Sequence, residues 1–211
     1  MIVLFLFSKP KILTPMNIVE RVKNILINPK QEWEVIDKEG TDIPKLITGY
    51  LLILALIPAV ASLIGYWLVG YRVPFVGHVG GTFAFGLRQA IVAFATPVIS
   101  VFIAAFVINL LAESFASQKD MRRAMQLVVY SFTASLVAGI FNLIPSLGII
   151  GLLAGLYGLY ILYIGLQPMM KTPKEKVTTY FIVSLLVMIV ASIVVGAILT
   201  PIIIGRGMMM Y

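Results

Sequence analysis

The apolar positions of this chain gather into five long runs without a charged residue, separated by short polar segments. The runs are Leu46–Val69, Ala90–Ala112, Met125–Ile144, Leu147–Leu166 and Tyr180–Ile204. A helix of about 20 residues, rising about 1.5 Å per residue, crosses a hydrocarbon core of ~30 Å. The pattern therefore predicts an all-α polytopic membrane protein, with a bundle of five transmembrane helices over residues 45–204.

A shorter, amphipathic pattern precedes the first run. Its apolar stripe faces a polar side that mixes acidic and basic residues; the stripe is Ile18, Val19, Val22, Ile25 and Leu26. We predict a helix with Thr14-Pro15 as N-cap and N1, ending near Asn28-Pro29. A second short helix is predicted from Pro29 to Lys38. The first helix either docks on a membrane surface or partner, or folds back onto the protein's own cytosolic loops.

Both ends of the chain extend beyond these predicted helices. The run MIVLFLF has no basic residue before it and no small-residue cleavage site after it, so it is a poor signal peptide. Because Met16 begins a more coherent segment, residues 1–15 are expected to be an extension from an upstream start. Residues 16–44 then form the cytosolic helical segment, and residues 205–211 a short outside tail.

Glycines mark the fourth run. Gly148, Gly151, Gly155 and Gly158 follow one another at intervals of three, four and three residues, so they share one helical face. Such a face lets a neighbouring helix approach closely in a bilayer, within the chain or in a second copy. We predict that it is a helix-packing surface and that the helix ends at Gln167-Pro168.

Lys and Arg residues are distributed unevenly between the two sides of the predicted bundle. The N-terminal segment and the loops after the second and fourth runs hold thirteen of them, whereas the other side holds three, Arg72, Arg88 and Arg206. The positive-inside rule therefore predicts a cytosolic N-terminus and an outside C-terminus in an integral, multi-pass protein. This asymmetry explains the net charge of +7 without a nucleic-acid partner.

The composition restricts the chemistry. Hydrophobic residues make up 60% and charged residues 12% of the chain, which has no cysteine and one histidine, His78. No predicted span contains His or Asp, and metal sites need clustered ligands. We therefore expect no catalytic residue, no metal site and no cofactor.

Two polar features remain. Pro58 and Pro97 interrupt the first two spans, the latter beside Thr96 and Ser100; they are either packing kinks or broken helices of a small transporter or channel. A second group is expected at similar depth near the cytosolic side, as an interhelical network, a partner contact or ordinary wetting at the interface. Its members are Asn109, Glu113, Gln126 and Gln167.

Two stretches are similar to a known family. The run R-V-K-N-I-L-I-N-P-K-Q-E-W (Arg21–Trp33) and the loop signature around Tyr157–Lys176, with K-T-P-x-E-K, resemble the prokaryotic branch of the YIP family of Ypt/Rab-interacting membrane proteins. The resemblance covers about Met16 to Ile204. It implies a five-helix membrane domain with no catalytic residues to transfer; eukaryotic members bind prenylated small GTPases and have longer N-terminal regions.

These patterns favour a non-enzymatic membrane scaffold or adaptor, in the cytoplasmic membrane if the chain is prokaryotic or in an internal membrane if it is eukaryotic. Its expected partners are membrane lipids and a cytosolic or membrane protein, with a second copy of the chain as a further candidate. The alternative is the small transporter or channel that uses the proline-broken spans.

Overall fold

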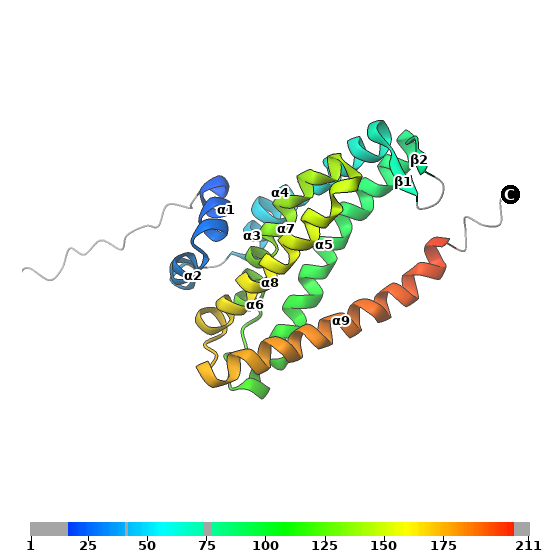
Figure 1. The fold of residues 1–211 in the computed structure, drawn as a ribbon. Coiled ribbons are helices and arrows are strands. Elements are labelled where there is room, and N and C mark those ends of the chain that lie inside the picture. Colours follow the sequence, from blue (N-terminus) through cyan, green and yellow to red (C-terminus); the bar gives the residue numbers. More distant parts are fainter. Residues whose placement is uncertain (1–16, 41, 74–76, 205–211) are drawn as a thin grey trace, which may run out of the picture.

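The computed structural model describes residues 17–40, 42–73 and 77–204, and for Arg72, Val73 and residues 191–204 it describes the backbone alone (Figure 1). The proposed extension at residues 1–15 and the tail at residues 205–211 lie outside the described residues. Almost all of the described chain is helical, which confirms the all-α prediction.

Two short helices come first. Helix α1 (Ile18–Ile27) begins after Asn17, whose side-chain oxygen accepts a hydrogen bond from the Val19 amide at 3.1 Å. Asn17 is therefore the N-cap of α1, while Thr14 and Pro15, the predicted N-cap and N1, lie outside the described residues. Helix α2 (Pro29–Asp37) starts on its proline, as expected.

The first span is one continuous helical segment, Ile43–Val69. It consists of α3 (Ile43–Leu46), a π-helical turn η1 (Ile47–Leu51), α4 (Leu52–Ile64) with Pro58 inside it, and a second π-helical turn η2 (Gly65–Val69). The segment after it forms an antiparallel hairpin of β1 (Tyr71–Val73) and β2 (Gly77–Val79). Gly70 and Gly77 there have φ angles of 79° and 96°, which glycine adopts most readily.

The second span begins seven residues earlier than predicted, since α5 covers Phe83–Leu111 and continues into the 3-10 turn η3 (Ala112–Phe115). Thr82 supplies the cap, its hydroxyl accepting from the Phe85 amide at 3.2 Å. The third span is divided into α6 (Met121–Ser131), α7 (Thr133–Ala138) and the 3-10 turn η4 (Gly139–Leu143), and η5 (Pro145–Leu147) leads into the next helix.

Helix α8 (Gly148–Met170) passes through Pro168, so the predicted stop at Gln167-Pro168 is wrong. A proline in the last turn removes only one hydrogen bond there, and the helix ends where Lys171 adopts a left-handed conformation with φ 52°. Helix α9 (Lys174–Ile204) follows and starts six residues before the predicted fifth span.

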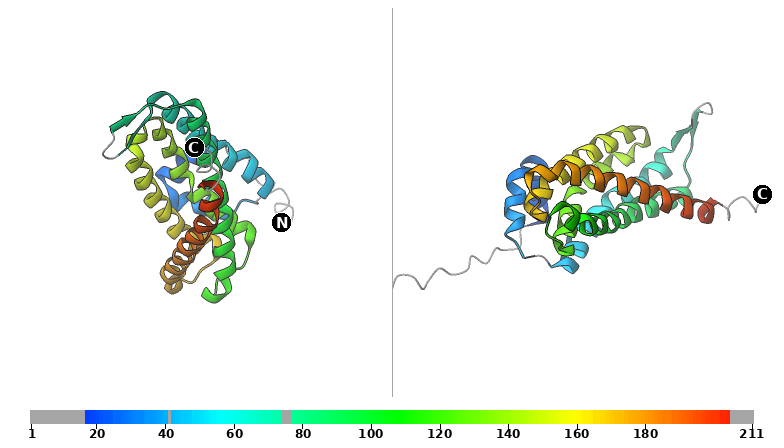
Figure 2. Two further views of the ribbon diagram at one scale, coloured as in Figure 1. Left: turned by 90° about the vertical axis from the view of Figure 1, so that its right-hand side faces the viewer. Right: turned by 90° about the horizontal axis from the view of Figure 1, so that it is seen from below.

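The helices pack into an elongated bundle (Figures 1 and 2). Helix α5 contacts α4, α6 and α9, and α8 contacts α2, α6, α7 and α9. We call the end with α2 and the α8–α9 connection the basic end, and the opposite end the β-hairpin end. Within the described residues, four segments are long and apolar enough to cross a membrane; the fifth predicted span corresponds to α9, whose side chains are described only to residue 190.

Candidate functional site

Trp33 fixes α2 to the side of the bundle. Its side chain is 1% exposed and its indole N–H donates to the Ile161 carbonyl of α8 at 3.1 Å. The ring occupies the space that Gly165 leaves: a Cβ at Gly165 would lie 2.6 Å from Trp33 Cε2 and 2.5 Å from Leu127 Cδ1. We call this recess, formed by Leu127, Ile161 and Gly165, the Gly165 notch. Neither the notch nor its occupant was among the predicted sites.

Helix α1 lies against α7 and α8. Ile25 is fully buried, and the Tyr157 hydroxyl of α8 donates to the Leu26 carbonyl at 2.7 Å. Val19, placed on the apolar stripe by the sequence, is 69% exposed instead. Of the two readings left open for this helix, the structure supports folding back onto the protein itself, although the surface it covers belongs to the spans and not to the loops.

A buried ionic cluster lies between the two short helices. The Arg21 guanidinium binds Glu32 and donates to Glu39 at 2.6 Å, and it stacks 5.4 Å from the centre of the Tyr130 ring. Burial alone would lower the pKa of Arg21, but the hydrogen bond to Glu39 and the nearby negative charges raise it overall. Because the charge is paired with two carboxylates, its burial is tolerated, and removing a partner would leave it uncompensated.

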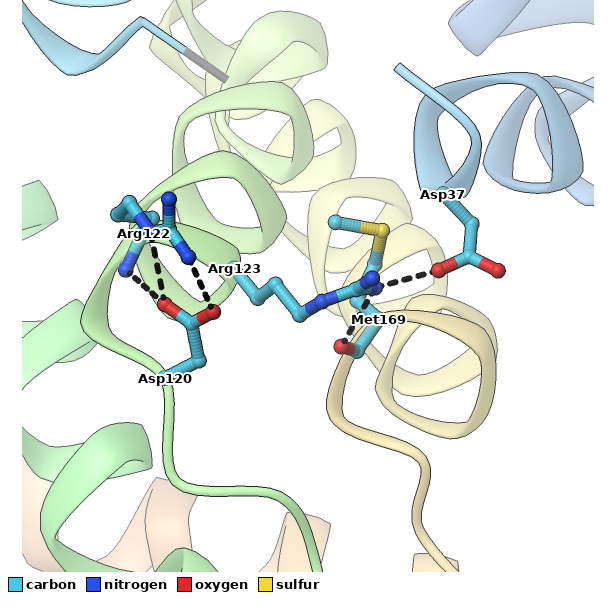
Figure 3. Close-up of polar contacts among 5 residues, drawn as sticks. All are labelled: Asp37, Asp120, Arg122, Arg123 and Met169. Atoms are coloured by element: carbon cyan, nitrogen blue, oxygen red, sulfur yellow. Dashed lines mark hydrogen bonds and ion pairs between the residues drawn. The ribbon is translucent and has the colours of Figure 1, made fainter. Parts of the chain in front are cut away.

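Asp37, the last residue of α2, connects this pair of helices to two spans (Figure 3). Its carboxylate binds Arg123 of α6, and its other oxygen accepts from Lys171 at the end of α8 at 2.6 Å. Burial raises the pKa of Asp37, but the hydrogen bonds and charges of Lys171 and Arg123 outweigh this and lower it overall. Arg122, beside Arg123 in the sequence, turns instead to Asp120 at 3.3 Å.

The four glycines of α8 do not share one environment. An added Cβ at Gly158 would lie 2.8 Å from the Ser131 carbonyl oxygen, and one at Gly155 would lie 3.9 Å from the Ser135 hydroxyl. At Gly148 and Gly151 it would meet no described atom within 4 Å. Among the described residues of one chain, only the Gly158 end of the predicted packing face is therefore in close contact with another helix.

A cavity of about 470 Å³ lies between α4, α5, α7 with η4, and α8. It brings together the four proline-region residues singled out in the sequence, Pro58, Thr96, Pro97 and Ser100. Gly151 contributes the α8 wall, so one predicted packing glycine borders this space. Its other polar lining residues are Ser62, Tyr66, Gln89, Ser135 and Asn142.

The domain model described as Yip1 domain matches residues 23–196, well over half of the chain. The chain belongs to the Yip1 family. No curated protein and no solved structure matches it. With the family and the apolar helices together, the chain is an integral, multi-pass membrane protein whose helices contact lipid.

The Yip1 match includes the Gly165 notch, Asp37 with both its partners, and the whole cavity lining, whereas Arg21 lies just before it. The sequence held a signal for the notch: Gly165 is a fifth glycine on the same helix, and Trp33 is one of only two tryptophans. Their separation of 132 positions conceals the pairing from any local pattern.

The four polar residues predicted to lie together near the cytosolic side are in different surroundings. Glu113 is exposed and pairs with Lys119 at 3.3 Å, and Gln167 is exposed as well. Gln126 is buried on α6, and the buried side-chain oxygen of Asn109 accepts no hydrogen bond from any described residue. No hydrogen bond joins any two of the four within the described part of the Yip1 domain, so their role as a network or partner contact stays a prediction.

The single histidine lies on β2, where its Nε2 is 2.9 Å from the Val69 carbonyl oxygen. The described residues contain no group of three or more His, Cys, Asp or Glu side chains that is placed to hold a metal ion.

Proposed function

We propose that this Yip1-family chain is a non-enzymatic membrane scaffold or adaptor whose contact surface is the outward face of α1 and α2. The observation that carries the proposal is the fixation of this pair of helices. The Gly165 notch and Asp37 attach the pair to α6 and α8, and Arg21, whose ion pairs join α1 to α2, stacks on the Tyr130 ring of α6. A surface held this firmly is preorganised, so a partner that binds it does not have to order it.

The outward face of the pair suits a partner that is partly apolar and partly negatively charged. Val19 and Ile27 of α1 are 69% and 63% exposed, and Val35 of α2 is exposed as well. Lys23 and Lys30 are exposed beside them. Glu20 and Glu34 are also exposed on these helices, so the acidic groups of a partner would lie opposite the lysines, as on a protein with an acidic rim or among the anionic head groups of a membrane.

The test is affinity purification of the full chain in a mild detergent, with mass spectrometry of proteins and lipids. A protein partner retained at fixed stoichiometry by the wild type and lost from a Val19→Ser, Ile27→Ser double variant supports the adaptor proposal. Leu68→Ser is the matched control, because Leu68 is 65% exposed at the β-hairpin end. Equal recovery from all three proteins would contradict the proposed surface.

The proposal also assigns the basic end to the cytosol, following the charge asymmetry. Because the chain has no cysteine, single cysteines can be introduced without background. In intact cells, a membrane-impermeant maleimide should label His78→Cys on the β-hairpin end and spare Lys30→Cys on α2. The opposite labelling pattern would invert the orientation.

A second copy of the chain is a further candidate partner. Gly148 and Gly151 leave open space on α8, and a small-residue face of this kind permits close helix contact in lipid. If a second copy packs there, Gly151→Ile should reduce association in crosslinking while the single chain keeps its thermal stability. An unchanged crosslinking yield would assign this face to lipid or to the cavity.

A second candidate function is that of a small transporter or channel, and the cavity is the observation that favours it. Helices α4 and α5 continue through Pro58 and Pro97, and both border the cavity at these prolines, where each proline leaves one backbone carbonyl without its helical hydrogen bond. Ser62→Cys and Ser100→Cys would report access: labelling by a small water-soluble reagent from both sides of the membrane supports transport. Labelling from one side only, or from neither, favours the scaffold.

A further inference from the structure

The α5 wall of the cavity has a row of polar groups at helical spacing. Gln89, Ala93, Thr96 and Ser100 are spaced four, three and four residues apart and all line the cavity. Pro97 has no N–H to give to the carbonyl four residues before it, so the Ala93 carbonyl oxygen is released from the helical ladder. We call these four residues the polar row.

The polar row lacks partners within the protein. No described residue forms a hydrogen bond with the side chains of Gln89, Thr96 or Ser100. Across the cavity the situation differs, because the Asn142 amide donates to the Ser62 hydroxyl at 3.0 Å. In a bilayer, hydroxyl and carbonyl groups of this kind gain when a ligand or water completes their hydrogen bonds.

The lining also limits the charge of any ligand. Among the described residues, the lining contains hydroxyl and amide groups and a tyrosine, but no Asp, Glu, Lys, Arg or His. A charged ligand at this position would lose its hydration without meeting a counter-charge, which costs several kcal/mol or more. An uncharged molecule with hydroxyl and carbonyl groups can both donate to the Ala93 carbonyl and accept from Thr96 or Ser100.

The size and surroundings point to an amphipathic molecule. At roughly 30 Å³ per water-sized group, the space of about 470 Å³ holds on the order of fifteen such groups, far more than one ion. The remaining lining is apolar, with Val92, Pro58, Phe132 and Leu136 among its members. The cavity is open over much of its boundary, with Thr96 exposed, so a chain longer than the cavity has a way out.

We propose that this cavity binds an uncharged lipid of the monoacylglycerol class, with its glycerol and ester oxygens on the polar row. The alkyl chain lies along the apolar lining and leaves through the open side of the cavity. The inference uses the same cavity as the second candidate function but requires binding only. Binding without transport would therefore leave it standing, and the scaffold proposal does not depend on it.

The experiment measures binding of monooleoylglycerol to the purified full-length chain in a mild detergent, by native mass spectrometry and by the shift in unfolding temperature. Oleate and 1-octadecene are the matched probes: the first replaces the glycerol ester with a carboxylate, and the second has no polar group. We expect saturable binding of one monooleoylglycerol and at least ten times weaker binding of the other two.

Two kinds of variant test the location. Gly151→Leu places a side chain where no described atom lies within 4 Å of the new Cβ, and should weaken binding at least about tenfold by occupying the cavity. Thr96→Val with Ser100→Ala removes two hydroxyls with little change in shape, and should weaken binding by about five- to tenfold. Gly148→Leu is the control, since Gly148 is equally open on the same helix but does not line the cavity.

Several outcomes would overturn the proposal. These are wild-type affinity in Gly151→Leu, equal binding of oleate, unaltered affinity in the hydroxyl-deleted variant, or no saturable binding of monooleoylglycerol at all. An equal loss in Gly148→Leu and Gly151→Leu would also overturn it, because the effect would then lie in helix association along α8. The hydroxyl-deleted variant keeps the test decisive if a leucine at position 151 prevents folding.

Discussion

The basic end and the β-hairpin end of this Yip1 domain are built from the same kind of apolar helix but are packed differently. At the basic end, Trp33 fills the Gly165 notch, and α1 and α2 cover the spans with buried ion pairs. Toward the β-hairpin end, α8 is open at Gly148 and Gly151, and a cavity separates it from α5. The difference lies along α8: its basic-end part packs against Trp33 and supports a fixed surface, whereas its part toward the β-hairpin end leaves room for a ligand or a helix.

The two tryptophans give the largest expected contrast between the ends. Trp33→Ala empties the Gly165 notch and should lower the free energy of unfolding by about 3–5 kcal/mol. Trp67 lies at the β-hairpin end and is already 41% exposed. Trp67→Ala should therefore lower the free energy of unfolding by well under half as much. Thermal unfolding in mild detergent measures both, and tryptic cleavage after Lys30 and Lys38 reports release of α1 and α2. Equal losses would mean that the two ends are equally well packed.

The glycines of α8 test the same contrast along one helix. Gly158→Ala forces a Cβ against the Ser131 carbonyl oxygen and should destabilise the protein by about 1–3 kcal/mol. Gly151→Ala meets open space and should be neutral or stabilise by up to about 1 kcal/mol, because alanine favours the helix. The midpoint of thermal unfolding distinguishes them. A destabilising Gly151→Ala would show that another chain occupies this face.

A smaller effect on stability is expected at Asp37. Burial alone would raise the pKa of its carboxyl group in the folded protein, but Lys171 and Arg123 lower it overall. A group with a lowered pKa stabilises the fold fully above its ordinary value, near 3.9 for aspartate, and loses this effect as the pH falls through the lower, folded value. Asp37→Asn should therefore cost on the order of 1 kcal/mol at neutral pH and little once the wild-type carboxyl is protonated.

Asp42→Asn is the matched control for this prediction. Asp42, the N-cap of α3, is about half exposed and pairs with Lys45 of that helix at 3.3 Å. An exposed pair of this kind contributes little, so the variant should unfold within a few tenths of a kcal/mol of the wild type. Unfolding midpoints of the three proteins measured from neutral to acidic pH decide the matter. A pH dependence that persists unchanged in Asp37→Asn would assign it to another carboxylate.

The local features of the chain were largely predictable. Span positions follow from runs of apolar residues, because a bilayer demands about 20 of them in a row. The boundaries were less accurate: α5 begins seven residues early because Thr82 caps it, and α8 continues past Pro168 because a proline near a helix end removes little. The β-hairpin was missed, since its strands are three residues each and its glycines indicate only a turn.

By itself, the sequence determined that this chain is a helical membrane protein, because solvent preference and helix length act on neighbouring residues. The motifs at Arg21–Trp33 and Tyr157–Lys176 indicated the Yip1 family. Only the tertiary structure decided which glycine of α8 packs against another helix and that Trp33 enters the notch at Gly165. It also decided that Pro58, Pro97 and Gly151 border one cavity. These contacts join residues far apart in the chain, and in lipid no difference in solvation separates one apolar helix face from another. Side-chain shape and buried polar pairing choose among the faces, and both exist only once the helices have packed.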